Sequence, residues 1–221
     1  MILDEIAEYT KERVRALKAH KSLYTVRDEA EGRPQGKDFR AALAAPGLSV
    51  IAELKKASPS KGIIAPDFTD IYLRKAAEYE VGGAAAISCL TEPKFFQGSD
   101  AYLQAVRQRV ELPLLRKDFT LDEYQIYEAK CIGADAVLLI CSLLSAAQLG
   151  EYLAQAQELG LSALVEAHTA AEVQQALAAG AEIIGVNNRN LKDFSVNPVN
   201  SLRLRDAIPA SKIFVAESGI Q

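Results

Sequence analysis

The chain has 221 residues, of which 49% are hydrophobic, and its composition shows no internal break. This length lies in the range of α/β barrels and favours a single domain over residues 1–221 with one large core. The net charge of −4 argues against nucleic-acid binding, because proteins of that class usually gather a basic excess on one face. An anionic ligand must therefore be held by locally placed cations.

Other classes are also excluded by the sequence. No apolar run reaches about 18 residues and the N-terminal segment is charged throughout, so we expect a cytoplasmic protein without a membrane span. Cys89, Cys131 and Cys141 are odd in number and lie in apolar stretches, which predicts reduced core thiols. Only His20 and His168 could serve as imidazole ligands, and neither is spaced from a cysteine as in a zinc site, so we expect no metal.

The first segment of the chain is predicted to be an amphipathic helix that caps the domain. Its apolar face is formed at three- and four-residue spacing by Leu3, Ile6, Thr10, Val14 and Leu17. A loop follows at 30–38, where Gly32, Pro34 and Gly36 interrupt charged residues. We assign residues 1–45 to an N-terminal helical extension.

The rest of the chain repeats a unit of apolar strand, helix-capping residues, helix and glycine. The capping boxes are expected at Thr120–Glu123, Ser145–Gln148 and Thr169–Glu172, and the glycines that end the helices are Gly133, Gly160 and Gly180. Strands are expected at 48–54, 84–90, 113–117, 135–141, 162–167, 182–187 and 213–217. These runs of Val, Ile, Leu and Ala suit parallel strands that are covered on both faces.

Parallel strands separated by helices form either a doubly wound sheet or a barrel, and the residues at the strand ends distinguish the two. Charged or amide side chains end most of the strands: Glu53, Lys55, Lys117, Glu166, Asn187, Arg189 and Glu217. A barrel brings all its strand ends to one mouth, whereas a doubly wound sheet gathers ligand groups at one switch point. We therefore predict an α/β fold, a (β/α)8 TIM barrel with an N-terminal capping extension, in a chain that ends after the seventh strand.

The first strand ends in a pair of opposite charges. Glu53 and Lys55 point to the same side, inward if Leu54 faces the helices, and the alternative to a catalytic role is a buried ion pair that fixes register. The following loop, Ser58–Gly62, is predicted to be a mobile lid, with an ordinary surface turn as the alternative.

Two later strand ends carry candidate acid/base groups. Neighbouring cations and desolvation could make Lys117 a proton donor near neutral pH, while Arg116 should face the opposite way. Glu166 is placed to act as a general base, and a structural salt bridge is the alternative for both groups. His168 is expected to be a hydrogen-bonding loop residue, because the sequence shows no partner that would tune it.

The strand-end motifs resemble those of the indole-3-glycerol-phosphate synthase family. They are Ile51–Gly62, Leu90–Ser99, Arg116–Phe119, Leu164–His168, Ile184–Arg189 and Val215–Gly219. The resemblance implies a lyase of tryptophan biosynthesis that closes 1-(2-carboxyphenylamino)-1-deoxyribulose 5-phosphate to indole-3-glycerol phosphate with loss of CO2 and water. It implies general acid/base catalysis on an anionic phosphate substrate, without a cofactor.

The same resemblance implies residue roles. Lys117 would be the general acid and Glu166 the base of the dehydration, but how Lys55, Lys117 and Glu166 divide the two proton transfers stays open. Orientation of the substrate hydroxyls and of the lysines would fall to Glu53 and Asn187. The implied substrate-binding residues are Ser58, Ser218 and Gly219 near the sugar or phosphate, Phe119 and Leu138 around the aromatic ring, and Arg189 and Glu217 at the mouth.

The family pattern continues beyond Gln221 with a helix, an eighth strand carrying a phosphate loop, and a closing helix. We therefore expect part of the phosphate site to be missing, unpaired edges on the first and seventh strands, and a monomer only if the barrel is complete. One alternative is another phosphate-binding barrel of tryptophan or histidine synthesis. An isomerase among these barrels would need a Cys and an Asp at strand ends as its acid/base pair. Cys141 and Asp135 do not suit this role, since they lie at opposite ends of one strand. A second alternative is a non-catalytic barrel fragment.

Overall fold

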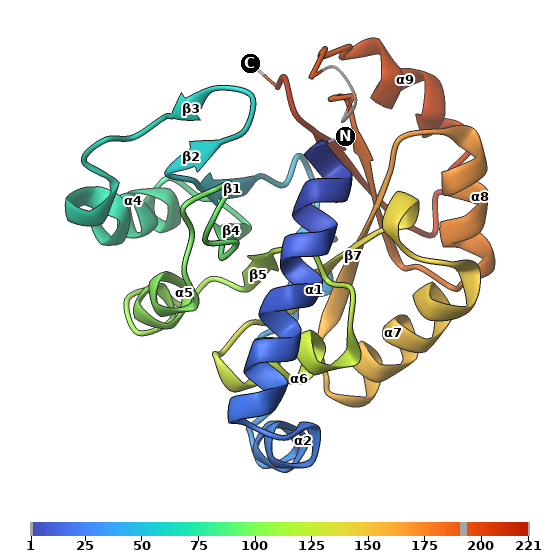
Figure 1. Cartoon of the computed structure of the whole chain (residues 1–221). Coiled ribbons are helices and arrows are strands. Elements are labelled where there is room, and N and C mark those ends of the chain that lie inside the picture. The colour runs from blue at the N-terminus through green and yellow to red at the C-terminus, as the bar shows by residue number, and fades with distance from the viewer. Residues whose placement is uncertain (1, 191–193, 221) are drawn as a thin grey trace.

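A curved, all-parallel sheet lies at the centre of the molecule in the computed structural model, which describes residues 2–190 and 194–220 (Figure 1). Its strands follow chain order as β1 (Ile51–Leu54), β4 (Ala86–Leu90), β5 (Leu114–Lys117), β6 (Ala136–Ile140), β7 (Ser162–Ala167), β8 (Ile183–Asn187) and β9 (Ile213–Glu217). Each lies within a predicted apolar run, so these strand predictions are confirmed. Among the described residues β1 pairs only with β4 and β9 only with β8, which leaves an open seven-stranded sheet with two free edges.

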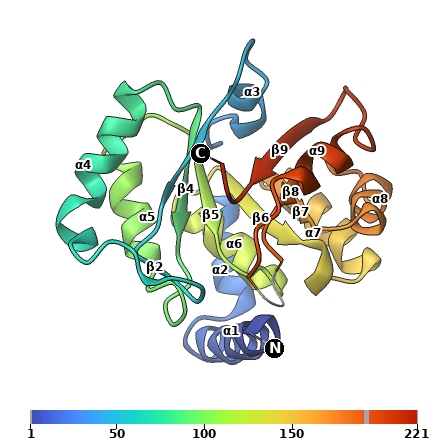
Figure 2. The ribbon, with the colours of Figure 1, turned by 90° about the horizontal axis from the view of Figure 1, so that it is seen from above.

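Helices cover the outer face of this sheet, as Figure 2 shows from above. They are α4 (Phe68–Val81), α5 (Asp100–Arg107), α6 (Glu123–Cys131), the short 3-10 helix η1 (Cys141–Leu143), α7 (Ala146–Glu158), α8 (Ala170–Ala178) and α9 (Val199–Arg205). Alternate residues of each strand separate into two apolar clusters. In β6, Val137 and Leu139 join the cluster under the helices, while Leu138 and Ile140 join the cluster inside the curve of the sheet.

Three helices precede the first strand: α1 (Ile2–His20), α2 (Leu23–Glu31) and α3 (Phe39–Leu43). The predicted amphipathic helix is confirmed as α1, whose buried face includes Ile6, Thr10 and Val14. Val14 packs in a separate cluster with residues of α2 and α6. No helix in the described part of the chain is both long and apolar enough to cross a membrane.

The helix ends confirm part of the predicted capping. Ser145 and Gln148 form the full capping box of α7, and the φ angles of Gly133, Gly160 and Gly180 are +88°, +67° and +89°. The box predicted at Thr120 is wrong. Thr120 is buried, and α6 begins after Asp122, whose side chain accepts the Tyr124 N–H.

Two short features differ from the sequence expectations. The predicted lid contains a small hairpin, β2 (Ala57–Ser58) with β3 (Gly62–Ile63), whose strands are too short to leave an alternating pattern. Thr169 caps α8 by accepting the Glu172 N–H, and the Glu172 carboxylate accepts the N–H of His168 at 2.6 Å. The contacts of Glu172 therefore reach one residue beyond the predicted box.

Candidate active site

The carboxyl ends of the strands open into a cavity of about 570 Å³. Every site residue predicted from the sequence lines it: Glu53, Lys55, Ser58, Lys117, Phe119, Leu138, Glu166, Asn187, Arg189, Glu217, Ser218 and Gly219. Because parallel strands end at one edge, side chains far apart in the sequence meet here.

Lys117 lies among carboxylates at the centre of the charged wall. Its Nζ is 2.5 Å from Glu217 Oε2 and 3.7 Å from Glu166 Oε2. Burial alone would lower the pKa of Lys117, but the charges of Glu217, Glu166 and Glu53 outweigh it and hold that pKa above its usual range. The expectation of neighbouring cations that lower this pKa is therefore wrong: strand register surrounds the ammonium with acids.

The pair at the end of β1 is arranged as the alternation predicts. Leu54 packs under the helices, while Lys55 Nζ donates to Glu53 Oε1 on the cavity side. Ser88 Oγ lies 3.4 Å from Glu53 Oε2. Burial would raise the pKa of the Glu53 carboxyl, but the charges of Lys117 and Lys55 outweigh it and hold that pKa below its usual range. Glu53 therefore links Lys55 and Lys117 electrostatically.

Glu217 is a closely confined carboxylate of the site. Burial and repulsion from Glu166 and Glu53 raise its pKa despite the contact with Lys117. Its Oε1 is buried without a hydrogen-bond partner among the described residues. A Cβ built on Gly185 of β8 would lie 2.1 Å from this oxygen, so only glycine leaves room for the carboxylate. Gly185 was not among the site residues expected from the sequence, although a glycine inside a strand is a signal of close approach.

The ends of β8 and β9 are joined by the buried amide of Asn188, which belongs to the Ile184–Arg189 motif. The side chain of Asn188 donates to the Ser218 carbonyl at 3.1 Å and accepts the Ser201 N–H of α9 at 2.9 Å. Ser218 and Gly219 follow in the left-handed region, with φ of +64° and +69°. A Cβ on Gly219 would lie 2.5 Å from Val196 Cγ1. The turn after β9 is therefore fixed from two sides.

Two polar residues of the β8 end are held by local contacts. Asn187 Oδ1 accepts the Arg189 N–H at 2.9 Å, and the Arg189 guanidinium donates to the Phe194 carbonyl at 3.1 Å. Both side chains remain on the cavity lining.

A second part of the cavity wall is apolar. Phe119 and Leu138 are joined there by Phe96, whose ring centroid is 5.9 Å from that of Phe119, and by Ile2, Leu3 and Ile6 of α1. The Glu92 carboxylate shapes the loop that carries Phe96, because it accepts the N–H groups of residues 94, 95 and 96. The predicted capping helix thus contributes directly to the cavity.

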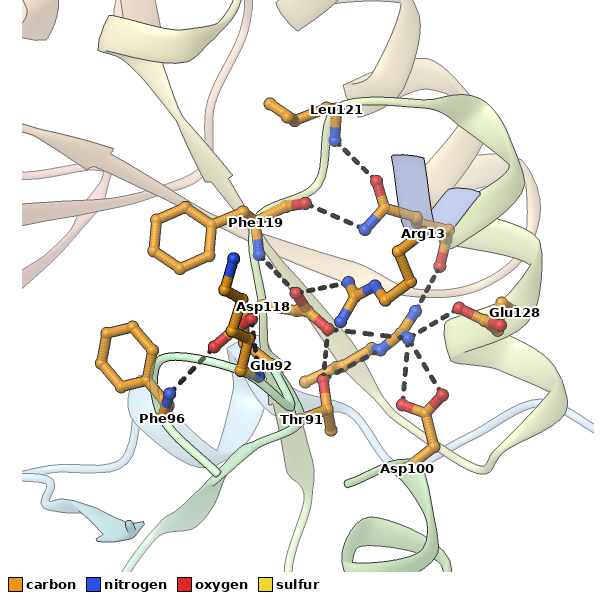
Figure 3. A network of polar contacts seen from close by, with 12 residues as sticks. Arg13, Thr91, Glu92, Phe96, Asp100, Asp118, Phe119, Leu121 and Glu128 are labelled. Carbon is orange, nitrogen blue, oxygen red and sulfur yellow. Dashed lines mark hydrogen bonds and ion pairs between the residues drawn. The ribbon is translucent and has the colours of Figure 1, made fainter. Parts of the chain in front are cut away.

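A buried ionic network behind β5 supports this wall (Figure 3). Arg116 faces away from Lys117, as predicted, and its Nη2 is 2.7 Å from Glu128 and 2.9 Å from Asp100. Burial would raise the pKa of the Asp118 carboxyl, but Arg13 of α1, at 2.8 Å, and Arg116 outweigh it and lower that pKa. Asp118 also accepts the N–H of Phe119 at 2.8 Å. The network therefore ties α1 to the strand that carries Lys117 and Phe119.

His168 lies in the short loop between β7 and α8, where its backbone N–H donates to Glu172 Oε2, so the expected hydrogen-bonding loop residue is confirmed. Its ring nitrogens are 3.5 Å from Glu166 Oε1 and 3.4 Å from Glu172 Oε2. The expectation that no partner tunes this histidine is therefore wrong. Glu172 follows four residues later on α8, so the spacing was visible in the sequence.

Comparisons with known proteins agree with this geometry. Residues 3–221 match the family model described as indole-3-glycerol phosphate synthase. The chain is 55% identical to the indole-3-glycerol phosphate synthase of Endomicrobium trichonymphae, with 100% of this chain and 86% of that protein covered. It is 53% identical to that of Ruminiclostridium cellulolyticum, with 100% and 85% covered.

A solved structure titled "Native KDPGal structure" is similar with a TM-score of 0.54 at 16% identity, covering 85% of this chain and 77% of that one. At this identity the likeness concerns the fold alone. The family model and the curated relatives carry the assignment, and the chain belongs to the indole-3-glycerol phosphate synthase family.

Proposed function

We propose that the chain closes 1-(2-carboxyphenylamino)-1-deoxyribulose 5-phosphate to indole-3-glycerol phosphate, releasing CO2 and water, in tryptophan biosynthesis. The observation that carries this proposal is the meeting of Lys55, Lys117 and Glu166 in one cavity whose other wall is apolar, in a chain of this family. A charged wall suits proton transfer to and from the sugar, and an apolar wall suits the aromatic ring.

Lys117 is proposed as the general acid of ring closure. A ring carbon attacks the ribulose carbonyl, and the ammonium of Lys117 gives its proton to the developing oxyanion. The surrounding carboxylates support this role because they keep the amine protonated before the reaction. They also favour rapid reprotonation, since a neutral Lys117 would leave several buried acids uncompensated.

Glu166 is proposed as the base of the dehydration that follows loss of CO2. Lys55 contacts the substrate and is the candidate donor of the second proton, to the departing hydroxyl. Glu53 and Asn187 orient the hydroxyl groups and the lysines. The ion pair between Glu53 and Lys55, with Lys117 acting on the same carboxylate, supports this arrangement.

Substrate binding is proposed to follow the two walls of the cavity. Phe119 and Leu138 hold the aromatic ring, and Phe96 belongs with them on the strength of its contact with Phe119. The phosphate and sugar lie near Ser58 and near the left-handed turn at Ser218 and Gly219, a backbone form whose successive N–H groups suit anions. Arg189 and Glu217 complete the mouth.

The architecture that we propose is a single (β/α) barrel domain over residues 1–221, which contribute seven strands of the (β/α)8 pattern, with 1–45 as an N-terminal helical extension. Pairing of the strands in chain order around one curved sheet supports the barrel. A cytoplasmic location, and a monomeric state for the complete barrel, belong to the same proposal.

An isomerase of the same pathway is not favoured by the geometry. Cys141 contacts the Glu172 carbonyl behind the sheet, and burial raises the pKa of its thiol to about 12. Asp135, at the other end of β6, is held by Arg107 and the Leu114 N–H. These two groups cannot act on one substrate.

The direct test follows indole fluorescence after the substrate is added to the full chain. Wild type should form product, Lys117→Ala should not, and Lys212→Ala should match wild type because Lys212 pairs with Glu182 on the surface. Calorimetry with the product separates binding from turnover. A folded wild type that binds the product but forms none would make the chain a non-catalytic barrel and refute the proposal.

A further inference from the structure

His168 is held between two carboxylates from different elements. Its backbone N–H donates to Glu172 Oε2 at 2.6 Å, and its Nδ1 is 3.4 Å from the same oxygen. On the other side of the ring, Nε2 lies 3.5 Å from Glu166 Oε1. This Nε2 is buried and has no hydrogen-bond partner among the described residues. The cavity lining includes Glu166 but neither His168 nor Glu172.

The two oxygens of Glu166 therefore face two different cations. Oε1 faces the imidazole of His168, and Oε2 lies 3.7 Å from the ammonium of Lys117. A carboxylate pulled from both ends has one preferred rotation about its terminal torsion, which is otherwise broad. The imidazole can donate to Glu166 and Glu172 at the same time only while it is protonated, because both carboxylates are acceptors and the neutral ring has one N–H.

We propose that His168, anchored by Glu172, is a positioning residue that fixes the Glu166 carboxylate so that Oε2 is presented to Lys117. The inference rests on the proposed function, in which Glu166 acts as a base. His168 touches no substrate in this arrangement and acts through Glu166.

The charged surroundings of the imidazole favour its protonated form. Besides Glu166 of β7 and Glu172 of α8, Glu217 of β9 acts on it from across the cavity. The Cys141 thiol of η1 lies near the same two glutamates and stays neutral, since burial raises its pKa to about 12. Burial would lower the pKa of His168, but the glutamates outweigh it and raise that pKa. The positive charge is thus present below the raised pKa and lost as pH rises through it.

The first test is an NMR titration of the histidine rings of the full chain. The chain has 2 histidines, and His20 is exposed at the end of α1, so the two signals are separable. Glu172→Gln keeps an acceptor for the backbone N–H but removes the charge, and it should lower the pKa of His168 by about 1. Glu166→Gln should also lower the pKa of His168, because it removes the second negative charge beside the ring. The matched control Glu182→Gln, which removes a surface ion pair, should leave it unchanged.

The second test is the pH dependence of turnover. In wild type, kcat should fall as pH rises through the pKa that NMR measures for His168. In Glu172→Gln this fall of kcat should occur at lower pH, displaced by as much as the pKa of His168 is lowered in the NMR titration. In His168→Gln the fall should be absent. His168→Gln should also lower kcat about 10-fold with little change in KM, because orientation rather than binding is lost.

The outcomes separate this inference from the proposed function. The positioning role alone is overturned if the pKa of His168 is unchanged in Glu172→Gln. It is also overturned if wild type and Glu182→Gln turn over normally but the fall of kcat with pH does not follow the NMR titration. A wild type that forms no product overturns the proposed function, and the positioning role with it.

Discussion

Gly185→Ala tests whether Glu217 is as tightly confined as the structure indicates. The added methyl group would lie 2.1 Å from Glu217 Oε1 and 3.2 Å from Leu164 Cδ1. Ordinary contact needs a separation larger by about 1 Å, so the carboxylate must move. Its other oxygen is 2.5 Å from Lys117 Nζ, so the movement breaks or lengthens the closest ion pair of the cavity.

Two consequences are expected from this displacement. Overpacking at a buried position costs about 1–3 kcal/mol of unfolding free energy. Misplacing Lys117 by about 1 Å should lower kcat about 100-fold, because proton transfer depends on geometry. Gly150→Ala is the matched control: nothing lies within 4 Å of its Cβ position in α7, so it should stabilise the protein by about 0.5–1 kcal/mol without changing turnover.

Urea unfolding and the indole fluorescence assay measure both effects. If the methyl group acts only through the carboxylate, Gly185→Ala should cost little stability in a Glu217→Ala background, where the space is vacated. Wild-type turnover in Gly185→Ala, with the stability gain seen for Gly150→Ala, would refute the argument that the carboxylate is confined there.

The remaining predictions concern proton transfer and the anchoring of α1. Lys117→Ala should lower turnover about 100-fold or more, as measured by product formation. The stability of this variant relative to wild type should improve as pH falls, because protonation of the carboxylates around position 117 removes their uncompensated charge; melting curves at two pH values check this. Glu166→Gln should slow turnover with little loss of product affinity, and an equal loss of affinity by calorimetry would make Glu166 a binding group. Arg13→Ala should cost about 1.5–3 kcal/mol because buried Asp118 loses its closest charged donor but keeps Arg116 nearby, whereas Lys18→Ala, at a more exposed pair, should cost at most about 1 kcal/mol in the same urea titration. The lowered pKa of Asp118 means that the Arg13 contribution is present at neutral pH and is lost as pH falls below about 4, so a difference that persists at low pH would contradict the ion pair.

The strands and the cavity lining could be predicted because each depends on local pattern. Continuous apolar runs define the strands, and a period of two places Glu53 and Lys55 on one side of Leu54 and Arg116 opposite Lys117. Parallel strands share one carboxyl edge, so residues at these ends had to meet. No knowledge of inter-strand distances was needed for these predictions.

The features that the sequence did not predict depend on register and packing. Glu217 lies beside Lys117 because β9 curves back towards β5, and this proximity reversed the expected direction of the lysine pKa. The capping of α6 was misassigned because Thr120 and Asp122 are both good capping residues, and burial of Thr120 decides between them. Gly185 is adjacent to the Glu217 carboxylate only in the folded sheet.

The division of the cavity into two walls has a consequence for how such a catalyst can change over generations. Most of the charged groups come from the ends of β1, β5, β7, β8 and β9, whereas Phe96 comes from the loop after β4 and Ile6 from a helix that precedes the sheet. Substitutions at these two apolar positions alter the shape offered to a ring without disturbing the ionic contacts of Lys117. Selection, or a directed-evolution library confined to these two positions, can therefore broaden substrate preference while the proton-transfer chemistry is inherited unchanged.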